Sequence, residues 1–324
     1  MRTAKPDQFP VETDTQIAVS VLDSLAAIPE EAVWLAKLKS RRTRLAYRRD
    51  VENFMGFVGI ASPSELRRVD HRAVIAWESH MRANQKLKAA TIRRRLAALS
   101  SLFSHLVRHS VVEINPVRDV ERPRVSRSQG KTLAFSQRQA RQLLDAPSPN
   151  TIQGLRDRAI LAIGLQVGLR RAEIARLLVS DLHQNRGLDS IWINRKGGKC
   201  ESVAIHPHVA HRIHDYLEAS CHGDQSDTAM FRPLHGNGRA TSTIRALHPD
   251  AVNRILKKYS KQLRQPAGYS AHSMRATFIT TALDNGASLE DVQRDVGHAD
   301  PSTTKLYDRR GHNPEKSASF FANY

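Results

Sequence analysis

The sequence predicts a mostly α-helical protein with two domains and one small β-hairpin, and three observations support this prediction. The 324 residues are enough for two domains of ordinary size. Apolar residues recur at helical spacing through most of the chain, and strand-like alternation is confined to residues 190–205. A polar, basic and aperiodic segment covers residues 117–131, as is typical of a linker. We therefore expect an N-terminal helical domain over residues 15–116 and a C-terminal domain over residues 132–324.

Composition and charge favour a polyanionic partner. Lys and Arg total 50 against 32 acidic residues, and the resulting formal charge of +18 favours binding to nucleic acid. No apolar run approaches the roughly 18 residues that would span a bilayer, and the N-terminus lacks an apolar signal segment. The two cysteines, Cys200 and Cys221, are too few for a disulfide framework. We therefore expect a cytoplasmic protein that binds DNA, with no membrane as a partner.

Helices are expected in the N-terminal domain wherever apolar residues return every three or four positions. This spacing predicts helices over residues 15–25, 30–38, 43–57 and 71–83. In the third of these helices, Leu45, Val51 and Phe54 are expected to face the core, together with Met55 or Phe57. Residues 1–15 are polar and are expected to form a loose tail.

The next helix, which is predicted to begin near Lys86, combines an apolar stripe with a cluster of basic residues. The stripe consists of Ile92, Leu96, Leu99, Leu102 and Phe103. The basic residues are Lys86, Lys88, Arg93, Arg94 and Arg95. Such a run is often only a solvated helix face, but the net charge of the chain favours contacts with DNA phosphates. These contacts would make affinity depend on salt without selecting a base sequence.

The C-terminal domain starts with a capping box, Ser136 with Gln139, and continues mainly as helices. Helices are predicted over residues 137–145, 155–166, 170–178 and 250–263, and strands over residues 190–194 and 201–205. Most of residues 220–243 is expected to be loop. Further along, Gly286 is expected to cap one helix and Ser288 to begin the next.

Two histidines, an arginine and a tyrosine occur close together near the end of the sequence. His272 and Arg275 are three residues apart and therefore share one helix face. His298 and Tyr307 follow across a short Asp-Pro-Ser break, with Tyr307 on a short helix predicted to begin at Ser302. Cationic donors stabilise the charge that develops when a nucleophile attacks a phosphodiester. The same surroundings help a tyrosine, whose ordinary pKa is about 10, to lose its proton.

These residues resemble the active-site motifs of the tyrosine recombinase (integrase) family. The family's His-x-x-Arg, Gly-His and tyrosine motifs are present, and a Gly-Leu-Arg-x-x-Glu element begins at Gly168. Lys196 lies on the predicted hairpin, where the family carries a lysine. The resemblance covers roughly residues 15–315. It implies a catalytic set that consists of Arg170, Lys196, His272, Arg275, His298 and Tyr307.

The resemblance also implies a role for each of these residues. Tyr307 would form a 3′-phosphotyrosyl bond with double-stranded DNA, with His272 as the general base and Lys196 as the general acid. Because cationic side chains would stabilise the transition state, neither a metal nor another cofactor would be needed. The phosphate oxygens would be held by three further residues, Arg170, Arg275 and His298.

At the level of domains, the resemblance implies a SAM-like, core-binding N-terminal domain and a catalytic C-terminal domain. It also implies assembly of a homotetramer on DNA, to which the apolar C-terminal residues 320–324 could contribute. These residues could equally pack within their own chain. The sequence departs from the family at Ala276, where members often carry a second histidine. This departure concerns local packing more than activity.

The sequence leaves several alternatives open. Glu173 could hold Arg170 by an ion pair or form a plain surface pair with it. His211 and His214 share a helix face and could bind a metal, or they could be ordinary surface or capping histidines. A type IB topoisomerase would use the same tyrosine chemistry to relax supercoils. A non-catalytic DNA-binding regulator would need the basic surface alone.

Overall fold

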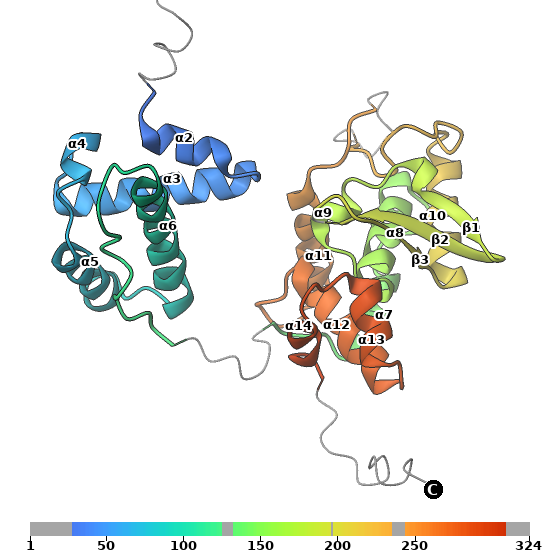
Figure 1. The fold of residues 1–324 in the computed structure, drawn as a ribbon. Coiled ribbons are helices and arrows are strands. Elements are labelled where there is room, and N and C mark those ends of the chain that lie inside the picture. Colours follow the sequence, from blue (N-terminus) through green and yellow to red (C-terminus); the bar gives the residue numbers. More distant parts are fainter. Residues whose placement is uncertain (1–27, 125–131, 196, 235–243, 309–324) are drawn as a thin grey trace, which may run out of the picture. The chain divides into compact units, whose positions relative to one another are not determined.

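The computed structural model describes residues 28–124, 132–195, 197–234 and 244–308. The chain forms two compact units, divided between Ser126 and Arg127, and each has its own hydrophobic core (Figure 1). The helix predicted over residues 15–25, the residue Lys196 and the C-terminal residues 320–324 lie outside the described residues. Within the described ranges, no helix is both long enough and apolar enough to cross a membrane.

The first unit is built around one central helix. Its helices are α2 (Glu30–Lys37), α3 (Arg41–Val58), α4 (Pro63–Leu66), α5 (His71–Ala83) and α6 (Ala89–Arg108). Helix α6 contacts α2, α3 and α5, and every residue of its predicted apolar stripe is at most 2% exposed. The stripe is therefore confirmed, as is the helix predicted over residues 71–83.

Two details of this unit differ from the prediction. Leu45 is 45% exposed, whereas Val51 and Phe54 are buried. Leu45 precedes Phe54 by nine residues, or two and a half turns, and therefore lies on the opposite face of α3. Helix α6 begins at Ala89 rather than near Lys86, because Lys86 has a positive φ of 48° that no helix continues.

The core of the first unit extends beyond its last helix. Val117 and Val120, at the start of the predicted linker, are buried among its apolar residues. Asn115 holds the turn that leads there: its side chain donates to the carbonyl of Ser100 at 3.0 Å and accepts from the backbone N–H of Val117 at 3.0 Å. The first residues of this segment thus pack on the first unit.

The second unit surrounds the buried helix α8 (Ile152–Gln166). The preceding helix, α7 (Gln137–Asp145), starts with the predicted capping box of Ser136 and Gln139. Helix α8 is buried on almost all sides because α7, α10 and α12 pack around it. The other helices are α9 (Arg171–Ile174), α10 (Pro207–Ala219), α11 (Pro249–Gln262), α12 (Ala271–Asp284), α13 (Leu289–Val296) and α14 (Pro301–Lys305).

A three-stranded antiparallel sheet lies beside these helices, in the order β1 (Leu182–Asn185), β2 (Leu188–Asn194) and β3 (Cys200–Ala204). Strands β2 and β3 confirm the predicted hairpin, whereas β1 is an addition to it, because its Leu-His-Gln-Asn sequence carries little strand signal. In the centre of the sheet, Ile191 pairs with Leu182 on one side and Val203 on the other.

Helix α9 is shorter than predicted, since it ends at Ile174 and not near residue 178. The backbone after it pairs with a distant segment instead of continuing the helix. Met230 donates its N–H to the carbonyl of Leu177 at 2.8 Å, and Val179 donates to the carbonyl of Thr228 at 3.0 Å. These tertiary hydrogen bonds outweigh the local helix preference of the segment.

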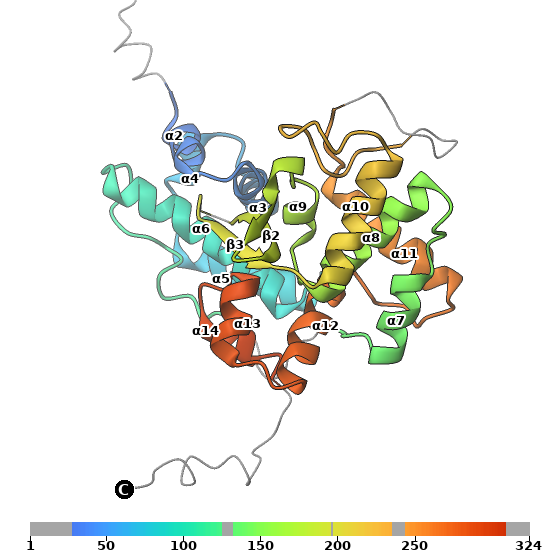
Figure 2. The same cartoon turned by 90° about the vertical axis from the view of Figure 1, so that its right-hand side faces the viewer.

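Helices α12, α13 and α14 lie side by side in both views of the molecule (Figures 1 and 2). Their contacts enclose a small apolar cluster that consists of Ala276, Ile279, Leu283, Val292, Val296 and Tyr307. Helix α14 ends at Lys305, so the prediction that Tyr307 lies within the helix is wrong, and the residue lies in the turn that follows. Ala276 is fully buried at the position where family members often carry a second histidine.

Candidate active site

Among the described residues of the predicted catalytic set, Arg275 is the most deeply buried, with 1% of its surface exposed. It donates from Nη1 to the carbonyl of Gly168 at 2.8 Å and from Nη2 to the carbonyl of Val296 at 2.6 Å. Its Nε–H has no acceptor among the described residues. Burial, followed by the charge of Arg170, lowers the pKa of Arg275 to about 9. The guanidinium therefore stays charged at neutral pH, with its Nε–H unused among the described residues.

Arg170 is held at the N-terminus of α9 by Glu173. The Glu173 carboxylate accepts from the backbone N–H of Arg170 at 2.7 Å and from its Nη1 at 2.7 Å. The ion pair expected from the sequence is therefore present. Only 8% of the Glu173 side chain is exposed, so it is more than a plain surface pair.

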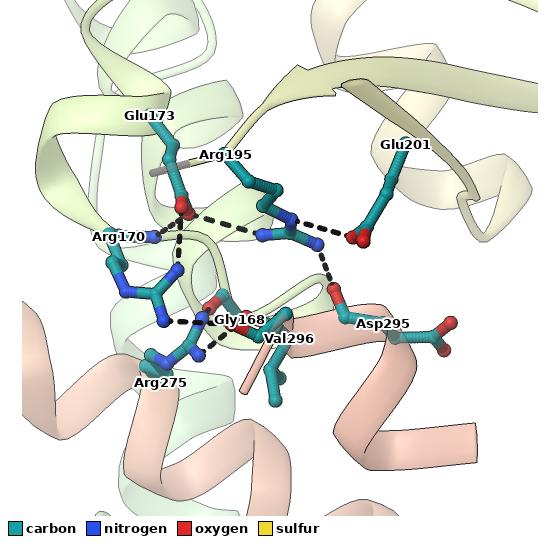
Figure 3. A network of polar contacts seen from close by, with 9 residues as sticks. Gly168, Arg170, Glu173, Arg195, Glu201, Arg275, Asp295 and Val296 are labelled. Carbon is teal, nitrogen blue, oxygen red and sulfur yellow. Dashed lines mark hydrogen bonds and ion pairs between the residues drawn. The ribbon is translucent and has the colours of Figure 1, made fainter. Parts of the chain in front are cut away.

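Three arginines donate hydrogen bonds to the C-terminal end of α13 (Figure 3). The carbonyls of Asp295, Val296 and Gly297 accept hydrogen bonds, each from a different guanidinium. The donors are Arg195, Arg275 and Arg170, in the same order. A helix C-terminus has unsatisfied carbonyls and a partial negative charge, and both favour cations at this place. The arrangement fixes the backbone directly before His298.

Tyr307 contacts His272 directly. The Tyr307 hydroxyl lies 3.1 Å from Nε2 of His272, within hydrogen-bond distance. Tyr307 is buried, with 7% of its surface exposed, whereas His272 is exposed to solvent. The pKa of His272 is lowered by partial removal of the ring from water and by the charges of Arg275 and Arg170. A neutral imidazole at this distance can accept the proton of the phenol.

His298 also lies near Tyr307, and the two rings are nearly parallel with centroids 6.5 Å apart. Its Nδ1 lies 2.8 Å from the hydroxyl of Thr304, which is fully buried. Burial of the imidazole, followed by the charges of Arg275 and Arg170, lowers the pKa of His298 to about 3. If Thr304 donates to Nδ1, the neutral ring carries its proton on Nε2 and can donate from there.

A cavity of about 550 Å³ opens beside this arrangement, and its lining is rich in charged and polar groups. Residues of the lining include Arg170, Arg195, Lys199, Glu201, Gly297 and His298. The cavity thus connects the end of the β2–β3 hairpin with the end of α13, at the place where an anion would meet the arginines.

The structure brings together five of the six residues predicted to be catalytic. Contacts join Tyr307 to His272, and the backbone around His298 to Arg170 and Arg275. The sixth residue, Lys196, lies outside the described residues.

Sequence reasoning missed two residues of the site, Arg195 and Thr304. Arg195 precedes the hairpin turn, where a basic residue is normally solvated, and nothing in the local sequence signals its burial. Thr304 is six residues from His298, and only the fold of α14 brings the two side chains together.

Away from this site, one group of described residues offers three possible metal ligands: Glu30, His105 and His109. The ammonium of Lys37 occupies this place, at 3.0 Å from Nε2 of His109 and 3.4 Å from Nδ1 of His105. A positive side chain already hydrogen-bonded to both imidazoles opposes cation binding. At the alternative histidine pair on α10, His211 pairs instead with Asp215 at 3.6 Å.

The five basic residues around the start of α6 differ in their surroundings. Lys86 and Lys88 are exposed. Arg93 donates to the carbonyl of Pro123 at 3.2 Å. Arg94 forms an ion pair with the buried Asp50, and Arg95 donates to the side chain of Asn53 at 2.7 Å. Of the five residues, the two lysines are therefore the most available for contacts outside the protein.

Fold and site together define a tyrosine recombinase, with a cationic pocket next to a buried tyrosine. Residues 134–313 match the model of the phage integrase family, and residues 30–110 match the phage integrase N-terminal SAM-like domain. The chain therefore belongs to the phage integrase family. This membership makes it an enzyme of site-specific DNA recombination, which cleaves and rejoins DNA strands.

Similar proteins include two tyrosine recombinases. XerC from Pelobacter propionicus is 30% identical over 270 residues, which cover 83% of this chain and 84% of that protein. XerD from Lacticaseibacillus casei is 28% identical over 271 residues, with coverage of 83% and 87%.

Solved structures with the same fold include a lambda integrase tetramer bound to a Holliday junction. It has a TM-score of 0.65 and 13% identity, and covers 89% of this chain and 77% of that one. The XerH recombinase bound to its difH substrate has a TM-score of 0.59 and 19% identity, with coverage of 80% and 72%. At these identities the likeness concerns the fold.

Proposed function

We propose that Tyr307 is the nucleophile of the recombinase and that His272 is its general base. The phenol oxygen attacks a DNA phosphorus and forms a 3′-phosphotyrosyl bond, while the bond from phosphorus to the 5′ oxygen breaks. His272 takes the phenol proton at Nε2. The observation that carries the proposal is the 3.1 Å distance between the Tyr307 hydroxyl and Nε2 of His272. The phosphotyrosyl bond conserves the energy of the phosphodiester, so rejoining needs no ATP.

Arg170 and Arg275 stabilise the negative charge on the non-bridging oxygens in this proposal. Arg275 has an unused Nε–H among the described residues, and Arg170 lines the cavity, with 40% of its side chain exposed. His298 donates a further hydrogen bond from Nε2. Lys196 gives a proton to the departing 5′ oxygen, a role that rests on the sequence resemblance alone. Preorganised donors of this kind stabilise the transition state without a metal ion.

The partner in this proposal is double-stranded DNA, and the working assembly is a homotetramer. The lambda integrase tetramer on a Holliday junction supports this assembly. Contacts with phosphates are assigned to five residues of the first unit. These are Lys86, Lys88, Arg93, Arg94 and Arg95. We place the reaction in the cytoplasm.

We propose that each domain has a separate role, with the domain boundaries expected from the sequence. Residues 15–116 bind DNA, residues 117–131 connect the domains, and residues 132–324 carry out catalysis. Val117 and Val120, at the start of the connecting segment, pack on the first core. The matches with Xer recombinases favour neither the topoisomerase nor the non-catalytic regulator.

Trapping of the covalent intermediate tests the proposal. Duplexes that the protein selects from a random pool are nicked near the selected site, so that the cleaved strand diffuses away before rejoining. Denaturing gels should then show a protein–DNA adduct with the wild type and none with Tyr307→Phe. Tyr269→Phe is the matched control, because Tyr269 contacts Gln139 outside the site. An adduct that persists in Tyr307→Phe would exclude Tyr307 as the nucleophile.

A further inference from the structure

We propose that Arg195 is a positioning residue for strand cleavage, which holds the backbone before His298 and the Arg170–Glu173 pair in their reactive arrangement. This inference rests on the proposed function. Arg195 follows strand β2 directly and is only 7% exposed. Its backbone closes the hairpin, since its N–H donates to the carbonyl of Lys199 at 2.7 Å. The side chain leaves the hairpin and turns toward α9 and α13 (Figure 3).

Each of the three nitrogen atoms of the Arg195 guanidinium contacts a different element. Nε donates to Glu201 on β3 at 3.1 Å, and Nη1 donates to Glu173 on α9 at 3.3 Å. Nη2 donates to the carbonyl of Asp295 on α13. The three contacts tie together segments that are up to 100 residues apart in the sequence. A planar guanidinium with several donors can serve three acceptors at once, which a lysine ammonium on a flexible stem does poorly.

The contact with Glu173 links Arg195 to a predicted catalytic residue. Glu173 Oε2 accepts from Arg195 and from the backbone N–H of Arg170, while Oε1 accepts from Nη1 of Arg170. One carboxylate therefore lies between two guanidinium groups. Without Arg195, Glu173 would lose a charged partner in a buried place and its orientation toward Arg170 would loosen.

The contact with α13 links Arg195 to His298. The Arg195 side chain lies against Gly297, whose φ of +61° ends the helix. A Cβ atom on Gly297 would lie 2.7 Å from Nε and 2.9 Å from Cδ of Arg195. The guanidinium thus occupies the space beside the residue that directly precedes His298. The position of the His298 ring depends on this backbone and on the hydrogen bond with Thr304. Removal of Arg195 would therefore weaken one of the two interactions that position the ring.

Single-turnover cleavage at saturating protein concentration tests this role. Arg195→Gln should slow adduct formation about 100-fold, as expected when an active site loses a residue that supports its geometry. Arg195→Lys keeps the charge but not the planar guanidinium, so its rate of adduct formation should lie between those of Arg195→Gln and the wild type. The control is Arg212→Gln, which removes an arginine of α10 that pairs with Asp145 at 3.0 Å, outside the cavity. It should stay within about 3-fold of the wild type.

A double-mutant cycle with His298→Ala separates positioning from a general loss of structure. If Arg195 acts largely through His298, Arg195→Gln should slow the His298→Ala protein by less than about 5-fold, because the ring that Arg195 positions is already absent. A full loss that persists in the His298→Ala background and also in an Arg170→Ala background would overturn the inference, as would Arg195→Gln cleaving at the wild-type rate. Tyr307→Phe is measured alongside: an adduct in that variant would contradict the proposed nucleophile, whatever Arg195 does.

Discussion

At the scale of single residues, the site combines permanent cations with neutral imidazoles. The arginines keep their charge when buried, whereas the pKa values of His272 and His298 are lowered by burial and by the neighbouring guanidinium groups. Both rings are therefore neutral at pH 7. His272 can accept a proton only in this state, and His298 gains no repulsive charge beside Arg170 and Arg275.

The lowered pKa of His298 predicts a change of stability with pH. Its pKa is about 3 in the folded protein and about 6.5 in an unfolded chain, so the unfolded chain binds more protons between these values. Stability is fully present above pH 6.5 and falls as the pH drops toward 3. One proton corresponds to a slope of at most about 1.4 kcal/mol per pH unit.

Urea unfolding of the wild type and His298→Gln between pH 4 and pH 8 measures this slope. The variant should lose less stability on acidification, because it has no imidazole that burial keeps neutral. His272 is unchanged in both proteins, so the difference isolates His298. Equal slopes in the two proteins would contradict the lowered pKa.

At the scale of elements, the junction between α13 and His298 controls the site. Gly297 ends α13 in the left-handed conformation, and the arginines converge on the carbonyls around it. Gly297→Ala would add a strained backbone conformation, at about 1 kcal/mol, and a clash with Arg195. We expect a lower melting temperature and cleavage slowed by at least about 10-fold, because small displacements in an active site have large effects.

Gly286→Ala is the matched control for this prediction. Gly286 also has a positive φ, of 96°, but an added Cβ would meet nothing within 4 Å. It should therefore show the cost of backbone strain without the clash, and cleave at close to the wild-type rate. Equal cleavage defects in the two variants would show that strain alone, and not the contact with Arg195, is responsible.

At the scale of the whole molecule, the charge of +18 predicts DNA binding that weakens steeply with salt. Lys86 and Lys88 are exposed, so we expect them to be available for phosphates. The double variant Lys86→Gln/Lys88→Gln should reduce the slope of log affinity against log salt by about 0.9 for each phosphate that is no longer neutralised. Affinity should fall similarly for selected and unrelated duplexes, measured by fluorescence anisotropy from about 50 to about 200 mM salt.

Arg94→Gln provides a contrast within the same cluster. Arg94 pairs with Asp50, which is 4% exposed, so its substitution should destabilise the first unit as well as weaken binding. Thermal unfolding should separate the two effects, since the lysine variants should unfold like the wild type. An unchanged salt slope in the lysine variants would remove Lys86 and Lys88 from the interface.

Much of this protein could be predicted from local patterns. Helical periodicity located α5, α6 and α11, the capping signals located α7 and α13, and alternation located the β2–β3 hairpin. The spacing of His272 and Arg275 predicted a shared face, and the motifs around Arg170, His298 and Tyr307 predicted one site. These features depend either on residues within one or two helical turns of each other or on short motifs. Both kinds of signal can be read from the sequence alone.

What the sequence determined by itself was therefore the helical architecture, the class of chemistry and most of the groups that we propose carry it. Only the tertiary structure decided that Arg195 is buried, that Thr304 meets His298 and that α9 stops at Ile174. Burial and hydrogen bonding of these segments depend on partners from 6 to about 100 residues away, and local propensity is too weak to specify such contacts. The position of His298 is set by these distant contacts, through the guanidinium groups that converge on the end of α13.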